Sequence, residues 1–297
     1  MAIVYKEITS NKLKSIVLLL VFVAFLMLVG FVFGEAVVGR GGGFGGLTIA
    51  GIIAVIYGLI GYFVGGKIAL AVSGAKEVTR KNVPQIYNMV ENLCITAGLP
   101  NPKIYIIDSQ AMNAFATGRD PKHSAVALTR GIIEKLDKRE LQGVIAHELS
   151  HIGNYDIRLS MLVVALVGAV AILSDVFLRF TIFGRGGGKK DGKVQLIMIL
   201  LAIALAIIAP LIAILIQLAI SRKREYLADA SGTLLTRDPN ALADALEKIS
   251  GHSELPKATK GTAHLYISNP LKKGAVAKWF STHPPAEERI KVLRGMV

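Results

Sequence analysis

The stretch His147-Glu148-Leu149-Ser150-His151 contains two histidines four residues apart, with a glutamate directly after the first. On an α-helix, side chains at i and i+4 lie one turn apart on the same face, so both imidazoles can bind one tetrahedral zinc ion. Glu148 lies beside them, where zinc-dependent hydrolysis needs a general base. Because these residue types are common, the H-E-x-x-H pattern also arises by chance in helices. The surrounding sequence therefore has to support the zinc site.

The residues before this motif predict a helix that follows a small sheet. Asp137 can cap a helix that begins near Lys138, because Glu140 follows the cap by three residues, as in a capping box. Apolar spacing predicts another helix over Val83–Ala97, which a Gly-Leu-Pro sequence ends. Three short apolar runs, separated by turn residues, are typical of strands: Lys103–Ile107, Ala114–Thr117 and Ala125–Thr129.

The hydrophobic residues of the chain are concentrated in four blocks. They make up 53% of the 297 residues, whereas a soluble domain has about 45–50%. The blocks run over about 16–33, 47–72, 159–183 and 194–220. Each has about the length that a helix needs to cross the hydrocarbon core of a membrane. The first block is too long for the apolar region of a signal peptide, and no A-x-A cleavage pattern follows it. We predict four membrane spans.

The four spans divide the chain into two membrane hairpins and two polar segments. The hairpins cover 1–72 and 159–220, and glycine-rich runs at 39–46 and 184–192 predict flexible links within them. The polar segments cover 73–158 and 221–297. Since two spans separate the polar segments, both lie on the same side of the membrane and can form one domain. The predicted fold class is α+β, a multi-pass α-helical membrane protein with a domain of helices and a small β-sheet.

The charge distribution favours a membrane protein with a cytoplasmic domain. The net charge is +13, but no basic stripe with interleaved aromatics indicates a nucleic-acid partner. Lys and Arg instead flank the apolar blocks, and the link between the first two spans contains only Arg40. This bias predicts cytoplasmic termini and a cytoplasmic polar domain in the cell membrane. The link between the last two spans does not fit this orientation, since it carries Arg185, Lys189, Lys190 and Lys193. The orientation is predicted from the first pair of spans, because early spans usually set the orientation of the whole chain.

The remaining site candidates come from the second polar segment and from the single cysteine. Catalytic zinc needs a third protein ligand, and Glu225 is 225 − 151 = 74 residues beyond His151, just past the second hairpin. Glu225 and Asp229 form an i, i+4 pair, so Glu225 can bind the metal while Asp229 accepts a hydrogen bond from a ligand histidine. The alternative is a solvated acidic pair that balances the basic residues at 222–224. The only cysteine, Cys94, excludes an intrachain disulfide and is predicted to be a small core residue.

His283 differs from the other histidines because two prolines follow it. The sequence Thr282-His283-Pro284-Pro285 fixes the backbone around the imidazole, which could then donate a hydrogen bond to the oxyanion during catalysis. It could equally organise the entry to the last helix. The other histidines, His123, His252 and His264, lie in polar stretches and are predicted to be surface residues.

Several motifs together carry a family resemblance. They are Asn113–Gly118, His147–His151 with Asp156, Ser221–Asp229, and Thr282–Pro285 with Arg289 and Ile290. With these motifs, the chain resembles the HtpX-type membrane proteases, which are relatives of the CAAX prenyl proteases. The resemblance covers nearly the whole chain, including the predicted spans, and the combination is more specific than any single motif.

The resemblance implies an integral membrane zinc endopeptidase with a gluzincin-like fold. One zinc ion per subunit would be bound by His147, His151 and Glu225, with Glu148 as the general base. The strand Asn113, Ala114, Phe115 and Ala116 would pair with extended substrate. The substrates would be misfolded or damaged membrane proteins or unfolded polypeptides, as in proteolytic quality control.

Four other functions compete with this one. A CAAX-type prenyl protease is expected to have more than four spans. A metal transporter would carry its ligands inside the spans, whereas the candidates here lie outside them. A non-catalytic scaffold would lack the base or a ligand. An intramembrane zinc protease would have the motif in an apolar helix, whereas this one follows Lys138, Arg139 and Glu140.

Overall fold

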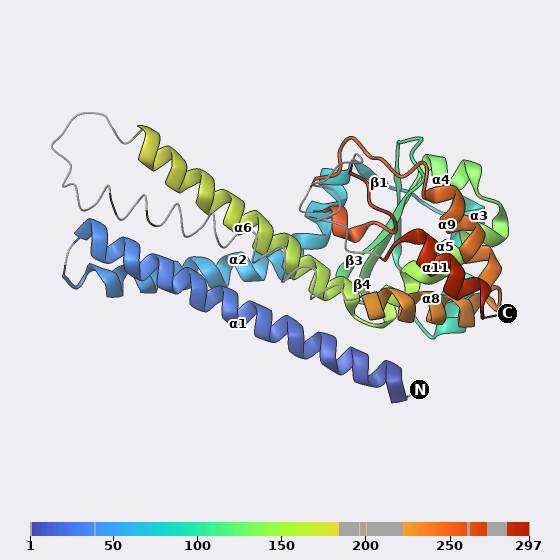
Figure 1. Cartoon of the computed structure of the whole chain (residues 1–297), viewed down its shortest axis with the longest axis horizontal. Coiled ribbons are helices and arrows are strands. Elements are labelled where there is room, and N and C mark those ends of the chain that lie inside the picture. Colours follow the sequence, from blue (N-terminus) through green and yellow to red (C-terminus); the bar gives the residue numbers. More distant parts are fainter. Residues whose placement is uncertain are drawn as a thin grey trace.

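The computed structural model describes residues 2–38, 40–183, 196, 200, 222–259, 262–271 and 284–296. Three long helices extend together to one side of a domain of shorter helices and a small sheet (Figure 1). The chain is therefore mostly helical with a small mixed sheet. His283 and most of the fourth predicted span, 194–220, lie outside the described residues.

The three long helices contain the first three predicted spans. They are α1 (Ala2–Val38), α2 (Gly42–Ser73) and α6 (Asp156–Phe183). Within the described residues, α1 and α2 are long and apolar enough to cross a membrane, and few of their residues are buried. Large apolar side chains such as Leu20 and Ile52 are exposed along both helices. A surface of this kind is stable against lipid rather than water.

Glycines let α1 and α2 pack closely. A side chain at Gly30 would collide with the carbonyl oxygen of Gly46, and one at Gly34 would collide with the carbonyl oxygen of Gly42. Small residues four positions apart are typical of membrane helices whose backbones approach each other. The prediction of a flexible link over 39–46 is therefore wrong for its second half. Helix α2 already begins at Gly42, because these glycines form its packing surface.

The sheet has four strands in the order β1-β2-β4-β3. Strands β2 (Lys103–Ile107), β3 (Ala114–Asp120) and β4 (His123–Thr129) confirm the three predicted strands. Strand β2 is parallel to β4, and the other two pairs are antiparallel. The first strand, β1 (Ala75–Glu77), was not predicted, because three residues are too short to show an alternating pattern. Strand β3 is an edge strand and forms a hairpin with β4.

Shorter helices pack around the sheet. They are α3 (Pro84–Ala97), α4 (Arg130–Lys135), α5 (Lys138–Gly153), α8 (Arg222–Thr236), α9 (Pro239–Ile249) and α11 (Ala286–Arg294), with a 3₁₀ turn, η1, at Ala263–Leu265. The predicted capping box of α5 is present. The Glu140 N–H donates to Asp137 Oδ1 at 2.9 Å, and the Asp137 N–H donates to Glu140 Oε2 at 2.8 Å. Cys94 on α3 is buried in the core, as predicted.

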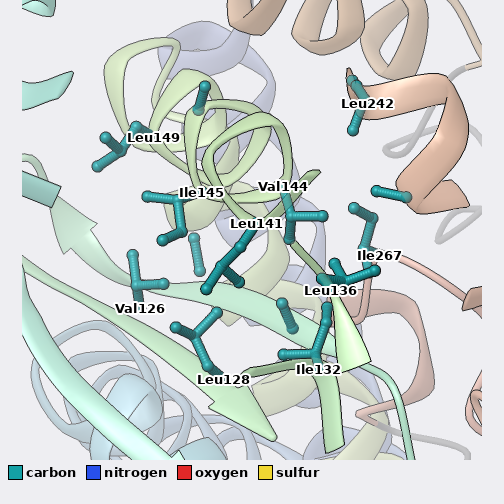
Figure 2. Packing of buried hydrophobic residues seen from close by; sticks show 14 of the residues in the cluster. Val126, Leu128, Ile132, Leu136, Leu141, Val144, Ile145, Leu149, Leu242 and Ile267 are labelled. Carbon is teal, nitrogen blue, oxygen red and sulfur yellow. The ribbon is translucent and has the colours of Figure 1, made fainter. Parts of the chain in front are cut away.

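The main core holds α5 in place between the sheet and α9. Leu141, Ile145 and Leu149 project from α5 toward Val126 and Leu128 of β4, and Leu242 approaches from α9 (Figure 2). Burying side chains of this size stabilises the fold by about 1.5–3 kcal/mol each. This packing orients α5, so the polar residues on the rest of its surface point to a defined place.

Candidate metal centre

His147 and His151 lie one turn apart on α5, with their Nε2 atoms 3.2 Å from each other. His147 is fully buried, and the His151 side chain is 14% exposed. The Nδ1 atom of each ring faces a carboxylate: Asp229 Oδ1 lies 3.0 Å from His147 Nδ1, and Asp156 Oδ2 lies 2.9 Å from His151 Nδ1. An ionised carboxylate only accepts hydrogen bonds, so each Nδ1 carries a hydrogen. In the neutral rings, each Nε2 then presents a lone pair.

Glu225 on α8 completes a cluster of three potential metal ligands. Its Oε1 lies 3.6 Å from His151 Nε2, and its Oε2 lies 3.7 Å from His147 Nε2. One ligand atom from each of the three residues lies within 4.8 Å of the others. A tetrahedral zinc ion with bonds of about 2.0–2.1 Å separates its ligand atoms by about 3.4 Å. The spacing and the N, N, O donor set therefore fit zinc.

A glycine allows α8 to approach α5 closely enough for this cluster. The Cβ of a larger residue at Gly232 would lie 3.0 Å from the backbone nitrogen of His147. Glu225 lies seven residues, or two turns, before Gly232 on the same helix. The close contact therefore brings α8 alongside α5, with the Glu225 carboxylate next to the two imidazoles.

The surroundings of the two imidazoles shift their pKa values in opposite directions. Burial and the nearby Arg289 guanidinium together outweigh the Asp229 carboxylate and lower the pKa of His147 to about 4. Burial also lowers the pKa of His151, but the carboxylates of Glu225 and Asp156 outweigh it and raise the pKa to about 9. The His151 side of the cluster therefore favours a cation, either a proton or a metal ion.

Glu148 lies beside this cluster and borders a small cavity. It is 2% exposed, and burial raises the pKa of its carboxyl to about 7. The carboxylate accepts a hydrogen bond from the backbone N–H of Ala116 on β3. Glu148, His151, Glu225 and Ala116 all line a cavity of about 30 Å³, which has room for a water molecule. A water there would lie between a carboxylate base and the potential metal ligands.

This arrangement can be compared with known proteins. Residues 80–297 match the family described as Peptidase family M48. The chain belongs to peptidase family M48. It is 45% identical over 293 residues to a protein of Tropheryma whipplei (strain Twist), and 42% identical over 299 residues to one of Streptococcus pneumoniae (strain Hungary19A-6). Both are named Protease HtpX homolog, and each comparison covers 98% of this chain and 98% or 99% of the relative.

A solved structure gives a likeness of fold. The crystal structure of S. mikatae Ste24p matches 97% of this chain and 67% of its own chain, with a TM-score of 0.53 and 18% sequence identity. The M48 match, the two HtpX homologues and the apolar helices α1 and α2 together make the chain a membrane metalloprotease, and the likeness of fold is consistent with this. The expected resemblance to HtpX-type proteases is thus confirmed, and the transporter and scaffold alternatives find no support.

In this M48 peptidase, Arg289 is a site residue for which the sequence indicates no role. It is 1% exposed, and its guanidinium donates to both carboxylate oxygens of Asp229, at 2.6 and 2.9 Å. It also donates to the carbonyl oxygen of Ile267 at 3.3 Å. Helix α11 is therefore tied to the carboxylate that holds His147. The only sequence signal was the position of Arg289 within the last motif.

Asn11 is a second unexpected residue, and it connects α1 to the cluster of potential metal ligands. Its Nδ2 donates to Asp156 Oδ1 at 2.8 Å and to the carbonyl oxygen of Asn154 at 2.9 Å. Its Oδ1 accepts from Arg224 Nη2 at 2.8 Å, and Arg224 Nε lies 2.8 Å from Asp156 Oδ1. Asp156 in turn holds His151. A buried polar chain therefore runs from the first long helix to a potential metal ligand.

The other histidines are placed as follows. His264 was predicted to be a surface residue, which is wrong. It is 5% exposed and lines the 30 Å³ cavity, with its Nε2 3.3 Å from the carbonyl oxygen of Ser160. The turn η1 buries it against α6, a contact between distant segments that a polar local sequence does not reveal. His123 and His252 are exposed, as predicted.

The predicted substrate strand lies at the edge of the sheet, but much of it already has partners. The Ala114 carbonyl oxygen accepts from the Ile267 N–H at 2.9 Å. Asn113 Nδ2 donates to two carbonyl oxygens, and the buried Phe115 ring packs against Tyr266 at 4.9 Å between centroids. Ala116 is the member of the strand that borders the cavity.

Proposed function

We propose that this chain is a zinc endopeptidase with four membrane spans and a gluzincin-like domain on the cytoplasmic side. Its substrates would be misfolded or damaged membrane proteins and other unfolded polypeptides. One zinc ion per subunit would be bound by His147, His151 and Glu225. The 159–183 segment coincides with the 28-residue helix α6, which supports a third span. The uninterrupted apolar sequence of 194–220 supports a fourth.

The observation that carries this proposal is the paired arrangement around the two imidazoles. Both Nε2 atoms face the Glu225 carboxylate, while Asp229 and Asp156 hold the two Nδ1 atoms. Carboxylates that hold ligand histidines in this way set the tautomer and raise the basicity of the nitrogen that binds the metal. A purely structural ion-pair network would have no need to leave two imidazole nitrogens directed at one carboxylate.

The chemistry follows from the position of Glu148. When bound, zinc would act as a Lewis acid that activates a water and polarises the scissile carbonyl. Glu148 would accept a proton from the attacking water and deliver it to the leaving amide nitrogen as the C–N bond breaks. The products are a carboxylate and an amine. Burial of Glu148 keeps bulk water from competing for this proton transfer.

Extended substrate would pair with the edge of β3. The resemblance implies this role for Asn113, Ala114, Phe115 and Ala116, and the contacts of the strand limit the part that is open to substrate. Because the Ile267 N–H already bonds the Ala114 carbonyl oxygen and the Ala116 N–H donates to Glu148, a substrate strand would join the sheet from the Ala116 carbonyl oxygen onward. Pairing through backbone groups gives affinity with little sequence preference. Such tolerance suits an enzyme that removes many different damaged proteins, as the resemblance to HtpX-type proteases implies.

The test is proteolysis of casein by the purified full-length protein in detergent. We expect cleavage that stops with a chelator and returns with zinc. Glu148→Gln should retain zinc and the folded structure but lose at least about 100-fold in kcat, because an amide cannot accept the proton. The matched control is Glu134→Gln, an exposed residue on the same domain. Near-normal turnover with Gln at position 148 would remove Glu148 from the mechanism.

A further inference from the structure

A second and larger cavity lies between the end of α2 and the β3–β4 hairpin. Its volume is about 310 Å³, and its lining does not include any of the proposed zinc ligands. Helix α2 contributes Phe63 and Lys67, β2 contributes Lys103, and the hairpin contributes Arg119, Lys122 and His123. In Figure 1 this region is where the long helix α2 enters the domain that holds the sheet.

The cavity carries a surplus of positive charge. Among its described lining residues there are four Lys or Arg side chains and no acidic one. Lys103 pairs with Glu77 at 2.9 Å, and Arg119 and His123 share Asp120, which lies just outside the lining. Lys67 and Lys122 are exposed and make no ion pair with any residue that the structure describes. These two lysines are therefore available to an anion.

Lys67 has an unusual position for a charged residue. It is the only Asp, Glu, Lys or Arg within Gly42–Ser73, the whole of α2. It lies one turn after Phe63, whose side chain is 53% exposed, and one residue before the exposed Ile68. An amine in this setting is next to both the apolar surface of the helix and the cavity. It is thus placed to contact a charged group that is attached to a hydrocarbon chain.

Aromatic rings and guanidinium groups surround this end of α2. The Arg119 guanidinium lies over the Phe63 ring at 4.9 Å, and that of Arg158 lies over the Tyr62 ring at 5.7 Å. Arg158 Nε also donates to the Arg119 carbonyl oxygen at 2.8 Å. Aromatic residues together with Lys and Arg are typical of the level of the lipid headgroups. The cavity therefore opens where the surface of a membrane would lie.

We propose that this cavity binds the phosphate headgroup of an anionic phospholipid. Lys67 and Lys122 contact the phosphate, and the acyl chains lie along the exposed apolar face of α2. A lipid fits better than an acidic peptide, because the basic cavity adjoins the apolar face of α2 that contacts the bilayer, and one lipid molecule can occupy both. The bound lipid connects the β3–β4 hairpin to the membrane. Since Ala116 lies on the same strand, this contact also steadies the edge at which substrate is proposed to pair.

The proposal is tested with full-length protein in nanodiscs. Neutral phosphatidylcholine discs are titrated with phosphatidylglycerol, and the retained lipid is counted by native mass spectrometry. The double variant Lys67→Gln/Lys122→Gln should bind phosphatidylglycerol about 10- to 30-fold more weakly, since each lysine near a membrane surface contributes about 1 kcal/mol. The matched control Lys76→Gln/Lys81→Gln removes the same charge outside the cavity and should bind like the wild type. Lys67→Arg/Lys122→Arg keeps the charge and should retain most of the binding.

Three results would overturn the proposal. The first is equal phosphatidylglycerol binding by the cavity variant and the control variant, with both folded by thermal melting. The second is displacement of the lipid by millimolar glycerol phosphate, which would indicate a site for soluble phosphates. The third is unchanged lipid binding together with a raised KM for an acidic peptide, which would make the cavity a subsite for substrate. These readouts do not depend on whether the zinc endopeptidase assignment is correct, except the last, which uses activity.

Discussion

Glu225 and Asp229 lie one helical turn apart, yet they face opposite edges of the same imidazole. Glu225 Oε2 lies 3.7 Å from Nε2 of His147, and Asp229 Oδ1 lies 3.0 Å from its Nδ1. The i, i+4 spacing in the sequence predicts that both carboxylates share a helix face. It does not reveal that the Asp229 carboxylate also binds Arg289, because that arginine lies 60 residues further along the chain.

The two carboxylates should therefore differ in their effect on bound zinc. Glu225→Ala removes a direct ligand and should abolish stoichiometric zinc binding. Asp229→Asn keeps an acceptor for the His147 Nδ1–H and should weaken zinc affinity by about 10–100-fold. Zinc content and competitive chelation measure both effects. Full zinc occupancy in Glu225→Ala would show that another residue is the third ligand.

Cys94 provides a prediction about pH that is independent of the metal. Burial, with a smaller contribution from the Glu91 carboxylate, raises the pKa of its thiol to about 11. The folded chain therefore keeps a proton that the unfolded chain loses above the ordinary thiol pKa of 9.0. Stability from this proton is present below pH 9 and falls as the pH rises toward 11. Thermal unfolding should thus lose more stability between pH 8 and pH 10.5 in the wild type than in Cys94→Ala. If the stability of the wild type and of Cys94→Ala fell equally over this pH range, the prediction would be wrong.

At the scale of elements, local sequence was enough to predict the helices and strands whose ends are marked by capping or turn residues. Helix α5 has a capping box, and strands β2, β3 and β4 have short apolar runs between turn residues. Strand β1 lacks such a signal, because its three residues Ala75–Glu77 are held only by pairing with β2. The length of α2 was also underestimated, since its first glycines look like a link until α1 is packed against them.

The contact between α1 and the metal cluster could not be predicted from local sequence. Asn11 and Arg224 are 213 positions apart, and an asparagine near the start of an apolar helix looks like any polar flanking residue. The folded chain makes it a buried bridge between Arg224 and Asp156. Removing a partner behind a metal ligand usually costs about 10–100-fold in metal affinity or activity.

Asn11→Ala should therefore change the metal site without touching a metal ligand. We expect zinc to dissociate about tenfold faster and the visible spectrum of the cobalt-substituted protein to shift, because His151 loses part of the support for its orientation. Ser15→Ala is the control. Ser15 lies one turn later on α1 and is also buried, and among the residues that the structure describes its hydroxyl bonds only the Asn11 carbonyl oxygen of its own helix. If the two variants lower thermal stability equally and neither changes the spectrum, Asn11 has only a structural role.

At the scale of the whole molecule, two polar segments separated in sequence build one site. His147 and Glu148 come from the polar segment 73–158, and Glu225 and Asp229 come from the polar segment 221–297. An even number of spans between the two segments would return the chain to the same side and so allow them to meet, and the cluster of His147, His151 and Glu225 is consistent with that prediction. The cytoplasmic side is predicted for this site from the distribution of Lys and Arg alone.

Thiol labelling of intact cells decides the orientation. Cysteines are introduced singly at Gly45 and at Lys81, with Gly187 as a further site in the second hairpin. Gly45 suits the first hairpin because a side chain there meets no atom within 4 Å, and Lys81 is exposed in the domain. Native Cys94 gives little background, since it is 1% exposed.

With a cytoplasmic domain, an impermeant maleimide should label cysteines at 45 and 187 in intact cells. A cysteine at 81 should react only after lysis. The physical reason is the cost of moving positive charge to the outer side, which is small for the link between the first two spans because it carries only Arg40. Position 187 is the sharper test, because the link between the last two predicted spans carries four basic residues that oppose the predicted orientation. Labelling at 45 without labelling at 187 would mean that 159–220 does not cross the membrane as a hairpin. Labelling at 81 alone would put the metal centre outside the cell and exclude cytoplasmic substrates.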